Sequence, residues 1–137
     1  KAPGGALLDI RAGTGVLSFV AVHSGAQRAL GTDIDVEAVR AAELNAALNG
    51  LSKRSRFIHT SARVTGSFDV AVINIELRPL LQVLAALPAA ARRVPKLYVT
   101  GFLASQLAEV TAAVKAAGFV PRRRSSEADW RLLQASR

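Results

Sequence analysis

Short apolar runs alternate with longer, amphipathic segments along most of the chain. The short runs are bounded by glycine and polar residues, which favours buried strands. We expect strands at residues 6–10, 28–32, 56–60, 68–73, 96–100, 119–124 and 130–135. The longer segments predict helices at residues 16–23, 36–48, 79–91 and 104–117, and Pro88 should end or kink the third of them. Loops are expected at residues 1–5 and 61–67.

This alternation is typical of a parallel sheet with helices on both faces. We therefore expect an α/β fold, a Rossmann-like three-layer sandwich whose seven-stranded sheet is mostly parallel and has an antiparallel last strand. The run from Phe68 to Ile73 is almost continuously apolar, which suits a central strand covered on both faces. Because the chain shows no internal repeat or linker, we expect one domain over residues 1–137.

The order of elements sorts the polar residues between the two edges of the expected sheet, because ligands bind where parallel strands end. Several positions follow strand ends and should share this carboxyl edge: Arg11–Gly15, Asp33, Asn74 and Gly101. Basic residues in helix-to-strand loops should lie at the opposite edge: Lys53, Arg54, Arg92 and Arg93. The final turn should return to the carboxyl edge, flanked by Arg122–Arg124, Glu127, Asp129 and Trp130.

The stretch 7–35 carries the clearest functional pattern, a strand, a glycine turn, a helix and a second strand that ends in Asp33. Gly13 and Gly15 have no Cβ, so the backbone can approach a ligand closely, and the next helix aims its free N–H groups at the same place. A carboxylate about 20 residues further on suits the hydroxyls of a ribose. The stretch therefore predicts a nucleoside-cofactor site. A nicotinamide dehydrogenase is less favoured, because Ser18 stands where the dinucleotide fingerprint needs a third glycine.

Composition narrows the class of protein further. The chain has no cysteine, so disulfides and thiol catalysis are excluded, and we expect a cytoplasmic location. It has no apolar run of membrane-spanning length and no His, Asp and Glu spacing typical of a metal site. The net charge of +8 suits contact with RNA or an acidic partner, or simply a solvated surface. One Trp and one Tyr provide no evident platform for stacking bases.

Two motifs, Gly13-Thr14-Gly15-Val16-Leu17 and Gly31-Thr32-Asp33-Ile34-Asp35, resemble those of class I S-adenosylmethionine-dependent methyltransferases. Others are more specific and make the chain most similar to the PrmA family, the methyltransferases of a large-subunit ribosomal protein. These motifs are Asn74-Ile75 with Pro79-Leu80, Thr100-Gly101-Phe102-Leu103, and Glu127 with Trp130. The resemblance runs almost from end to end.

The resemblance implies a role for each matching residue. Asp33 would hold the ribose hydroxyls of S-adenosylmethionine, Gly13 and Gly15 would shape the cofactor turn, and Asp9 would brace that turn. Asn74 would be the catalytic residue, at the place where the methyl group meets a lysine or another amine of a protein substrate such as a ribosomal protein. No metal is implied. We expect a monomer that can also contact RNA through its basic surface.

Several of these residues also have a purely structural interpretation. Asn74 can stabilise a turn, and Trp130 is as well suited to a core as to the wall of an acceptor pocket. Asp35 is better explained as a helix cap than as a ligand, and Asp69 as support for a loop at the start of its strand.

Two features depart from the family. Arg11 occupies a position of the cofactor turn where the family has glycine. Its side chain can fill the space for the cofactor, or its guanidinium can pair with the cofactor carboxylate; we favour weakened binding. The resemblance also implies that this chain begins after the family's upstream cofactor loop and substrate-recognition domain. Three functions therefore stay open: a protein methyltransferase, a cofactor-free scaffold or binding domain, and an RNA methyltransferase.

Overall fold

The computed structural model describes residues 4–60 and 63–137, so the loops expected at 1–5 and 61–67 lie partly outside the described residues. Strands and helices alternate as expected. Their bounds are β1 (Ala6–Ile10), α1 (Val16–His23), β2 (Arg28–Asp33), α2 (Val36–Leu48), β3 (Ser55–His59), β4 (Val70–Asn74), α3 (Leu77–Ala85), α4 (Ala89–Arg92), β5 (Lys96–Leu103), the 3₁₀ turn η1 (Ala104–Gln106), α5 (Leu107–Ala116), β6 (Val120–Glu127) and β7 (Trp130–Ser136).

The strands form one seven-stranded sheet in the order β3-β2-β1-β4-β5-β7-β6. β1 pairs in parallel with β2 and β4, and the pairs β2–β3 and β4–β5 are parallel as well. β7 is antiparallel to both of its neighbours. This confirms a mostly parallel sheet with an antiparallel last strand. The strand order reverses between β1 and β4, and a ligand crevice is expected where these two strands end.

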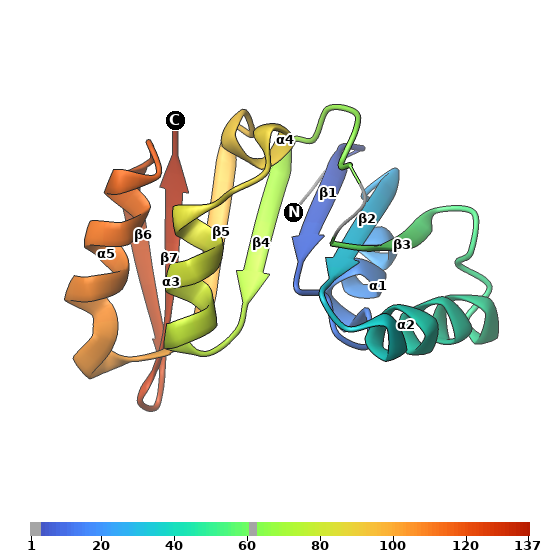
Figure 1. Cartoon of the computed structure of the whole chain (residues 1–137), viewed down its shortest axis with the longest axis horizontal. Coiled ribbons are helices and arrows are strands. Elements are labelled where there is room, and N and C mark those ends of the chain that lie inside the picture. Colours follow the sequence, from blue (N-terminus) through green and yellow to red (C-terminus); the bar gives the residue numbers. More distant parts are fainter. Residues whose placement is uncertain (1–3, 61–62) are drawn as a thin grey trace.

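Helices cover both faces of the sheet, which confirms the three-layer architecture. Figure 1 shows α3 and α5 over the half of the sheet that holds β4 to β7, while α1 and α2 lie at the other half. β1 shows the alternation of a strand between two layers. Leu8 belongs to the cluster that includes Leu84 of α3 and Val110 of α5, and Leu7 packs with Val22 of α1.

The expected central position of β4 is confirmed, but the expected cover of both its faces is incomplete. Ala71 and Ile73 are buried, but Val70 and Val72 on the other face are only half-buried. They lie at the margin of the cluster formed by Leu7 and its neighbours. The reason is the position of α1, which makes its main contacts with β1, β2 and β3. The strand is therefore covered fully on one face only.

The later helices differ from their expected bounds. Pro88 divides the expected helix 79–91 into α3 and α4. α3 begins at Leu77, so Pro79 falls in its first turn, where an N–H has no partner within the helix. The expected helix 104–117 begins with the 3₁₀ turn η1, where the Leu103 N–H donates to Gln106 Oε1 at 2.9 Å.

The last strands are longer than expected. β5 continues past Thr100 to Leu103, because Phe102 and Leu103 pair with Arg131 and Trp130 of β7. A bulge between Thr100 and Phe102 accompanies this extension. β6 likewise runs on to Glu127, which pairs with Trp130. These pairings place the turn between β6 and β7 at the carboxyl edge of the sheet.

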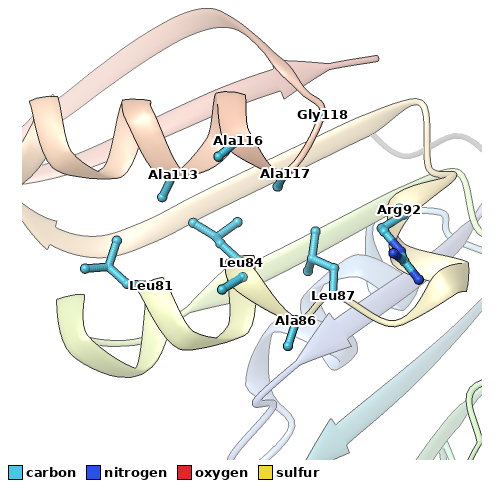
Figure 2. Close-up of a pocket in the computed structure, with 10 residues that line it drawn as sticks. Leu81, Leu84, Ala86, Leu87, Arg92, Ala113, Ala116, Ala117 and Gly118 are labelled. Carbon is cyan, nitrogen blue, oxygen red and sulfur yellow. The ribbon is translucent and has the colours of Figure 1, made fainter.

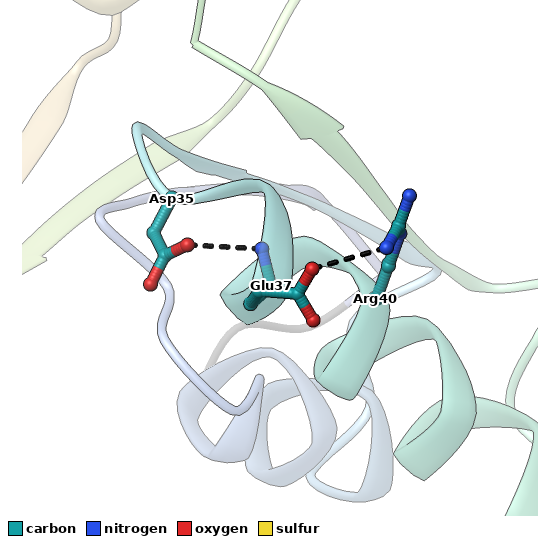
Figure 3. Close-up of polar contacts among 3 residues, drawn as sticks. All are labelled: Asp35, Glu37 and Arg40. Atoms are coloured by element: carbon teal, nitrogen blue, oxygen red, sulfur yellow. Dashed lines mark hydrogen bonds and ion pairs between the residues drawn. The ribbon is translucent and has the colours of Figure 1, made fainter.

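The start of α2 confirms that Asp35 is a helix cap. Asp35 Oδ1 accepts a hydrogen bond from the Glu37 N–H at 2.9 Å, and Glu37 Oε1 lies 3.0 Å from Arg40 Nη1. Figure 3 shows these contacts along the first turn of the helix. The ion pair is exposed and adds little stability, whereas the cap sets the point at which the chain turns after β2.

Candidate active site

The turn between β1 and α1 is tied to the end of β2. The Ala12 N–H donates to the Thr32 carbonyl at 2.9 Å, and the Gly15 N–H donates to the Ala12 carbonyl at 3.0 Å. Gly15 has φ 90°, and a Cβ there would come within 2.8 Å of Phe19 and Phe57. Gly13 has φ 58°, but a Cβ there would meet nothing within 4 Å. Gly15 is thus needed for packing, while Gly13 borders open space.

Asp33 ends β2 and points at this turn. Its Oδ2 accepts the Gly13 N–H at 2.9 Å, and its Oδ1 accepts the Asp35 N–H at 3.0 Å. Asp33 is buried, with 8% of the residue's surface exposed. Each carboxylate oxygen has a further lone pair, so both remain able to accept a second hydrogen bond.

Asp9 lies beneath the same turn, between β1 and α1. It is 1% exposed, and Ser18 Oγ of α1 donates to its Oδ2 at 2.8 Å. The pKa of Asp9 is raised from 3.8 to about 6, chiefly because burial disfavours the carboxylate; the hydrogen bonds from Ser18 act against this rise, and the neighbouring Asp33 adds a smaller upward contribution. With almost no exposed surface, Asp9 can support the turn through α1 but offers no face to a ligand.

Arg11 follows β1 directly and has φ 62°. This left-handed conformation is unusual for a residue with a Cβ, and within the described residues only Ala128 shares it among non-glycine residues. Ile10 pairs with Ile73, so the next positions, Arg11 and Asn74, leave their strands side by side. Within the described part of the chain, the Arg11 guanidinium has no hydrogen-bond or ion-pair partner.

Asn74 ends β4, is exposed, and pairs in register with Thr100 of β5. A cavity of about 400 Å³ opens beside it, lined by Asn74, Ile75, Glu76, Thr100, Gly101 and Trp130. A second cavity of about 410 Å³ adjoins it, lined by Glu76, Leu77, Arg78, Gly101, Leu103, Gln106 and Trp130. Trp130 is therefore a cavity wall rather than a core residue.

The sequence interpretation missed Glu76. It follows Asn74 in the same strand-to-helix loop, so its position after a strand end was the available clue. It also missed the reason for Gly101, where φ is 92° and a Cβ would stand 2.5 Å from the Ile75 carbonyl oxygen. Gly101 thus lets the bulge of β5 close against the loop that carries Glu76.

Three other groups of residues named in the sequence analysis lie away from the glycine turn and the cavity of Asn74. Arg122–Arg124 run along the outer strand β6 and not beside the final turn, because Arg123 pairs with Gln134 near the middle of β7. Arg54 lies at the amino edge, where its guanidinium donates to the Ala26 carbonyl at 2.7 Å. Asp69 supports the start of β1, since its Oδ2 accepts the Ala6 N–H at 2.7 Å.

A third cavity, of about 500 Å³, lies between α3 and α5 and contains none of the expected site residues. Figure 2 shows leucine and alanine side chains of the two helices facing one another, with Arg92 of α4 at one end. Among the residues that the structure describes, no group of acids and histidines could hold a metal ion. Within residues 4–60 and 63–137, every helix is too short or too polar to span a membrane.

Comparison with known proteins gives a consistent result. The family model described as Ribosomal protein L11 methyltransferase (PrmA) matches residues 1–137. The ribosomal protein L11 methyltransferase of Azotobacter vinelandii is 39% identical over 115 residues, which are 83% of this chain and 39% of that protein. That of Geobacter metallireducens is 33% identical over 130 residues, 94% of this chain and 43% of that protein.

A solved structure, the ribosomal protein L11 methylase of Lactobacillus delbrueckii subsp. bulgaricus, is 32% identical and superposes with a TM-score of 0.87. The superposition covers 98% of this chain and 70% of that one. The chain spans about two fifths of the length of the two methyltransferases named above, from Azotobacter vinelandii and Geobacter metallireducens. Because that family model matches residues 1–137, the chain belongs to the PrmA family of ribosomal protein L11 methyltransferases.

Proposed function

We propose that this chain is the catalytic domain of an S-adenosylmethionine-dependent methyltransferase that acts on amino groups of a protein, with ribosomal protein L11 as its substrate. The observation that carries this proposal is the hydrogen bond from the Gly13 N–H to Asp33 Oδ2. It joins the glycine turn and the acid of the second strand into one feature at the carboxyl edge of the sheet, the edge at which Asn74 ends β4. The names of the relatives support the choice of substrate.

The residues of this edge fit the proposed cofactor. The open space at Gly13 leaves room for a ligand against the backbone, and the free N–H groups of α1 begin just beyond it. Asp33 would accept hydrogen bonds from the ribose hydroxyls, using the lone pairs that the turn leaves unused. Asp9 would hold the turn in place from below, through Ser18.

Asn74 would orient the methyl acceptor. The bound cofactor supplies a methyl group on a sulfonium leaving group, so the protein needs to position the reactants and needs no nucleophile of its own. A lysine amine must be neutral to react, which costs about 4–5 kcal/mol at pH 7. The Asn74 side-chain oxygen would accept a hydrogen bond from the neutral amine and so orient it toward the methyl group.

A second candidate function, a cofactor-free scaffold, is favoured by one observation, the left-handed backbone of Arg11 at the edge of the turn. If the arginine obstructs the cofactor, the change Arg11→Gly should restore or strengthen binding of S-adenosylhomocysteine in calorimetry. If the guanidinium instead pairs with the cofactor carboxylate, the same change should weaken binding.

We further propose that the domain works as a cytoplasmic monomer and that its basic residues can contact RNA near the protein substrate. An RNA methyltransferase is the remaining alternative. It predicts RNA binding that weakens steeply with added salt, because basic side chains release counterions from the phosphates. Filter binding with a short RNA at low and moderate salt tests this, and the absence of binding at low salt would dismiss it.

Calorimetry with S-adenosylhomocysteine, the demethylated product, tests the main proposal. Asp33→Ala should weaken binding by roughly 1.5–3 kcal/mol, about 10- to 150-fold, because charge-assisted hydrogen bonds are lost. Asp69→Ala is a matched control, since Asp69 also accepts a backbone N–H but at the opposite edge of the sheet. If the parent chain does not bind the ligand, or if both variants lose the same affinity, the proposal fails.

A further inference from the structure

Arg11 differs from the other basic residues in the part of the chain that the structure describes. The lysine and arginine residues there are exposed, except Arg11 and Arg131, which are half-buried. Arg131 donates to the carbonyls of Ala128 and Trp130, at 3.0 and 2.9 Å. The Arg11 guanidinium has no hydrogen-bond or ion-pair partner among the same residues. Its N–H donors are therefore left for a ligand or for water.

The backbone gives no reason for an arginine at this position. Its φ of 62° lies in the left-handed region, which glycine adopts readily and a residue with a Cβ adopts at a cost. Strain of this kind clusters at functional sites. An unpaired charge on a strained backbone thus points to a role of the guanidinium itself.

The sheet places Arg11 at the centre of the carboxyl edge. The last residue of β1 pairs with Thr32 of β2 and with Ile73 of β4. The next position, Arg11, therefore lies between Asp33 and Asn74, which follow these two partners along their strands. Asp33 is the proposed partner of the ribose and Asn74 that of the methyl acceptor. The reacting sulfur of the cofactor has to lie between the two, and so on the side of Arg11.

Carboxylates also face this edge and oppose the charge of Arg11. Asp33 is buried, and its two oxygens accept backbone N–H groups, while Asp9 is sealed below the turn. Glu76 lines the cavity beside Asn74. Within residues 4–60 and 63–137, none of these acids forms an ion pair with Arg11. Because they are the same in the parent chain and in every Arg11 variant, a comparison of such variants isolates the effect of the guanidinium.

The two forms of the cofactor differ in charge at the sulfur atom. S-adenosylmethionine carries a sulfonium there, and S-adenosylhomocysteine carries a neutral thioether. The ammonium and the carboxylate of the amino-acid part are common to both. A salt bridge from the guanidinium to this carboxylate would therefore strengthen both ligands alike, whereas repulsion from the sulfonium acts on S-adenosylmethionine alone.

We propose that Arg11 is a selectivity residue of the cofactor turn, whose charge weakens the binding of S-adenosylmethionine relative to S-adenosylhomocysteine. The inference rests on the proposed function, because it requires that the turn binds this cofactor. The methyl donor binds against the guanidinium, while the product binds without this repulsion, so Arg11 favours retention of the product. The glycine that the family has at this position carries no charge and lacks this effect.

Calorimetry with both ligands measures the selectivity as the ratio of their two dissociation constants. Arg11→Gln removes the charge but keeps a Cβ and most of the length, so the backbone cost stays close to that of the parent chain. It should shift the ratio at least about threefold towards S-adenosylmethionine, the order expected for unit charges several ångströms apart at the edge of a protein. Arg11→Lys keeps the charge and should stay close to the ratio of the parent.

Two controls separate charge from shape. Arg93→Gln changes the net charge by the same amount, but Arg93 is exposed at the end of α4, at the amino edge, so the ratio should not change. Added salt should shrink the difference between the parent and Arg11→Gln, because screening weakens the repulsion. A side chain that merely fills space would not respond to salt in this way.

The inference is overturned if Arg11→Gln has the same ratio as the parent, if Arg11→Lys behaves like Arg11→Gln, or if the difference does not respond to salt. Binding of S-adenosylhomocysteine to the parent separates this result from the proposed function. If that ligand binds and the ratio does not depend on the charge at Arg11, the inference alone is wrong. If neither ligand binds the parent, Arg11→Gln or Arg11→Gly, the proposed function falls and the inference falls with it.

Discussion

Replacing Asp9 with asparagine should stabilise the protein at neutral pH and not at acidic pH. The carboxylate is sealed between β1 and α1, and its pKa is raised from 3.8 to about 6, chiefly by burial. A native pKa above the unfolded value means that the folded chain binds the proton more tightly. Protonated Asp9 therefore gives the parent chain a stability that is complete below about pH 4 and is lost as the pH rises through 6.

The size of the effect follows from the pKa values. At roughly 1.4 kcal/mol per pH unit, a rise from 3.8 to about 6 means that ionised Asp9 costs about 3 kcal/mol at pH 7.5. Asparagine keeps the shape and still accepts the hydrogen bond from Ser18 Oγ. Its amide N–H groups need acceptors of their own, so we expect a net gain of about 1–3 kcal/mol.

Urea unfolding followed by circular dichroism at pH 4, 5.5 and 7.5 measures this directly. The difference in free energy of unfolding between Asp9→Asn and the parent should grow by about 2.5 kcal/mol from pH 4 to pH 7.5, whatever the cost of the amide. Asp69→Asn, which only weakens one backbone hydrogen bond at an exposed site, should show no gain at pH 7.5. A difference that does not change with pH would refute the reasoning.

Two further substitutions test how the carboxyl edge is built. Gly101→Ala should lower the free energy of unfolding, measured in urea, by about 2–4 kcal/mol, because the new Cβ would stand 2.5 Å from the Ile75 carbonyl oxygen at a positive φ. Gly25→Ala is the control and should cost only about 1 kcal/mol, because φ there is 111° but nothing lies within 4 Å of the new Cβ. Equal losses in the two variants would contradict the predicted clash at Gly101. Asp35→Ala should cost about 1 kcal/mol in the same assay through loss of the cap on α2, and a neutral result would show that the cap is not needed.

The part of the site that sequence reasoning predicted depends on local order along the chain. A strand, a glycine turn, a helix and a parallel strand have one preferred, right-handed arrangement, so the position of Asp33 beside Gly13 follows from spacing. The cap at Asp35 and the break at Pro88 are likewise properties of a few neighbouring residues.

The remaining features depend on contacts between segments distant in sequence. The extension of β5 requires Leu103 to pair with Trp130, and nothing within residues 96–103 shows this pairing. Glu76 and Trp130 line the same cavity only because the final hairpin returns to the carboxyl edge of the sheet. The half-buried Val70 and Val72 show a limit of another kind, since an apolar run does not reveal how far a helix reaches across the sheet.

The most direct test of the cofactor site is an amide NMR titration of the unmodified chain with S-adenosylhomocysteine. The account predicts saturable shifts that are largest at Gly13, Gly15 and Asp33, extend to Asn74, and disappear in Asp33→Ala. Shifts confined to the groove between α3 and α5, or no saturable shift at all, would contradict the central claim.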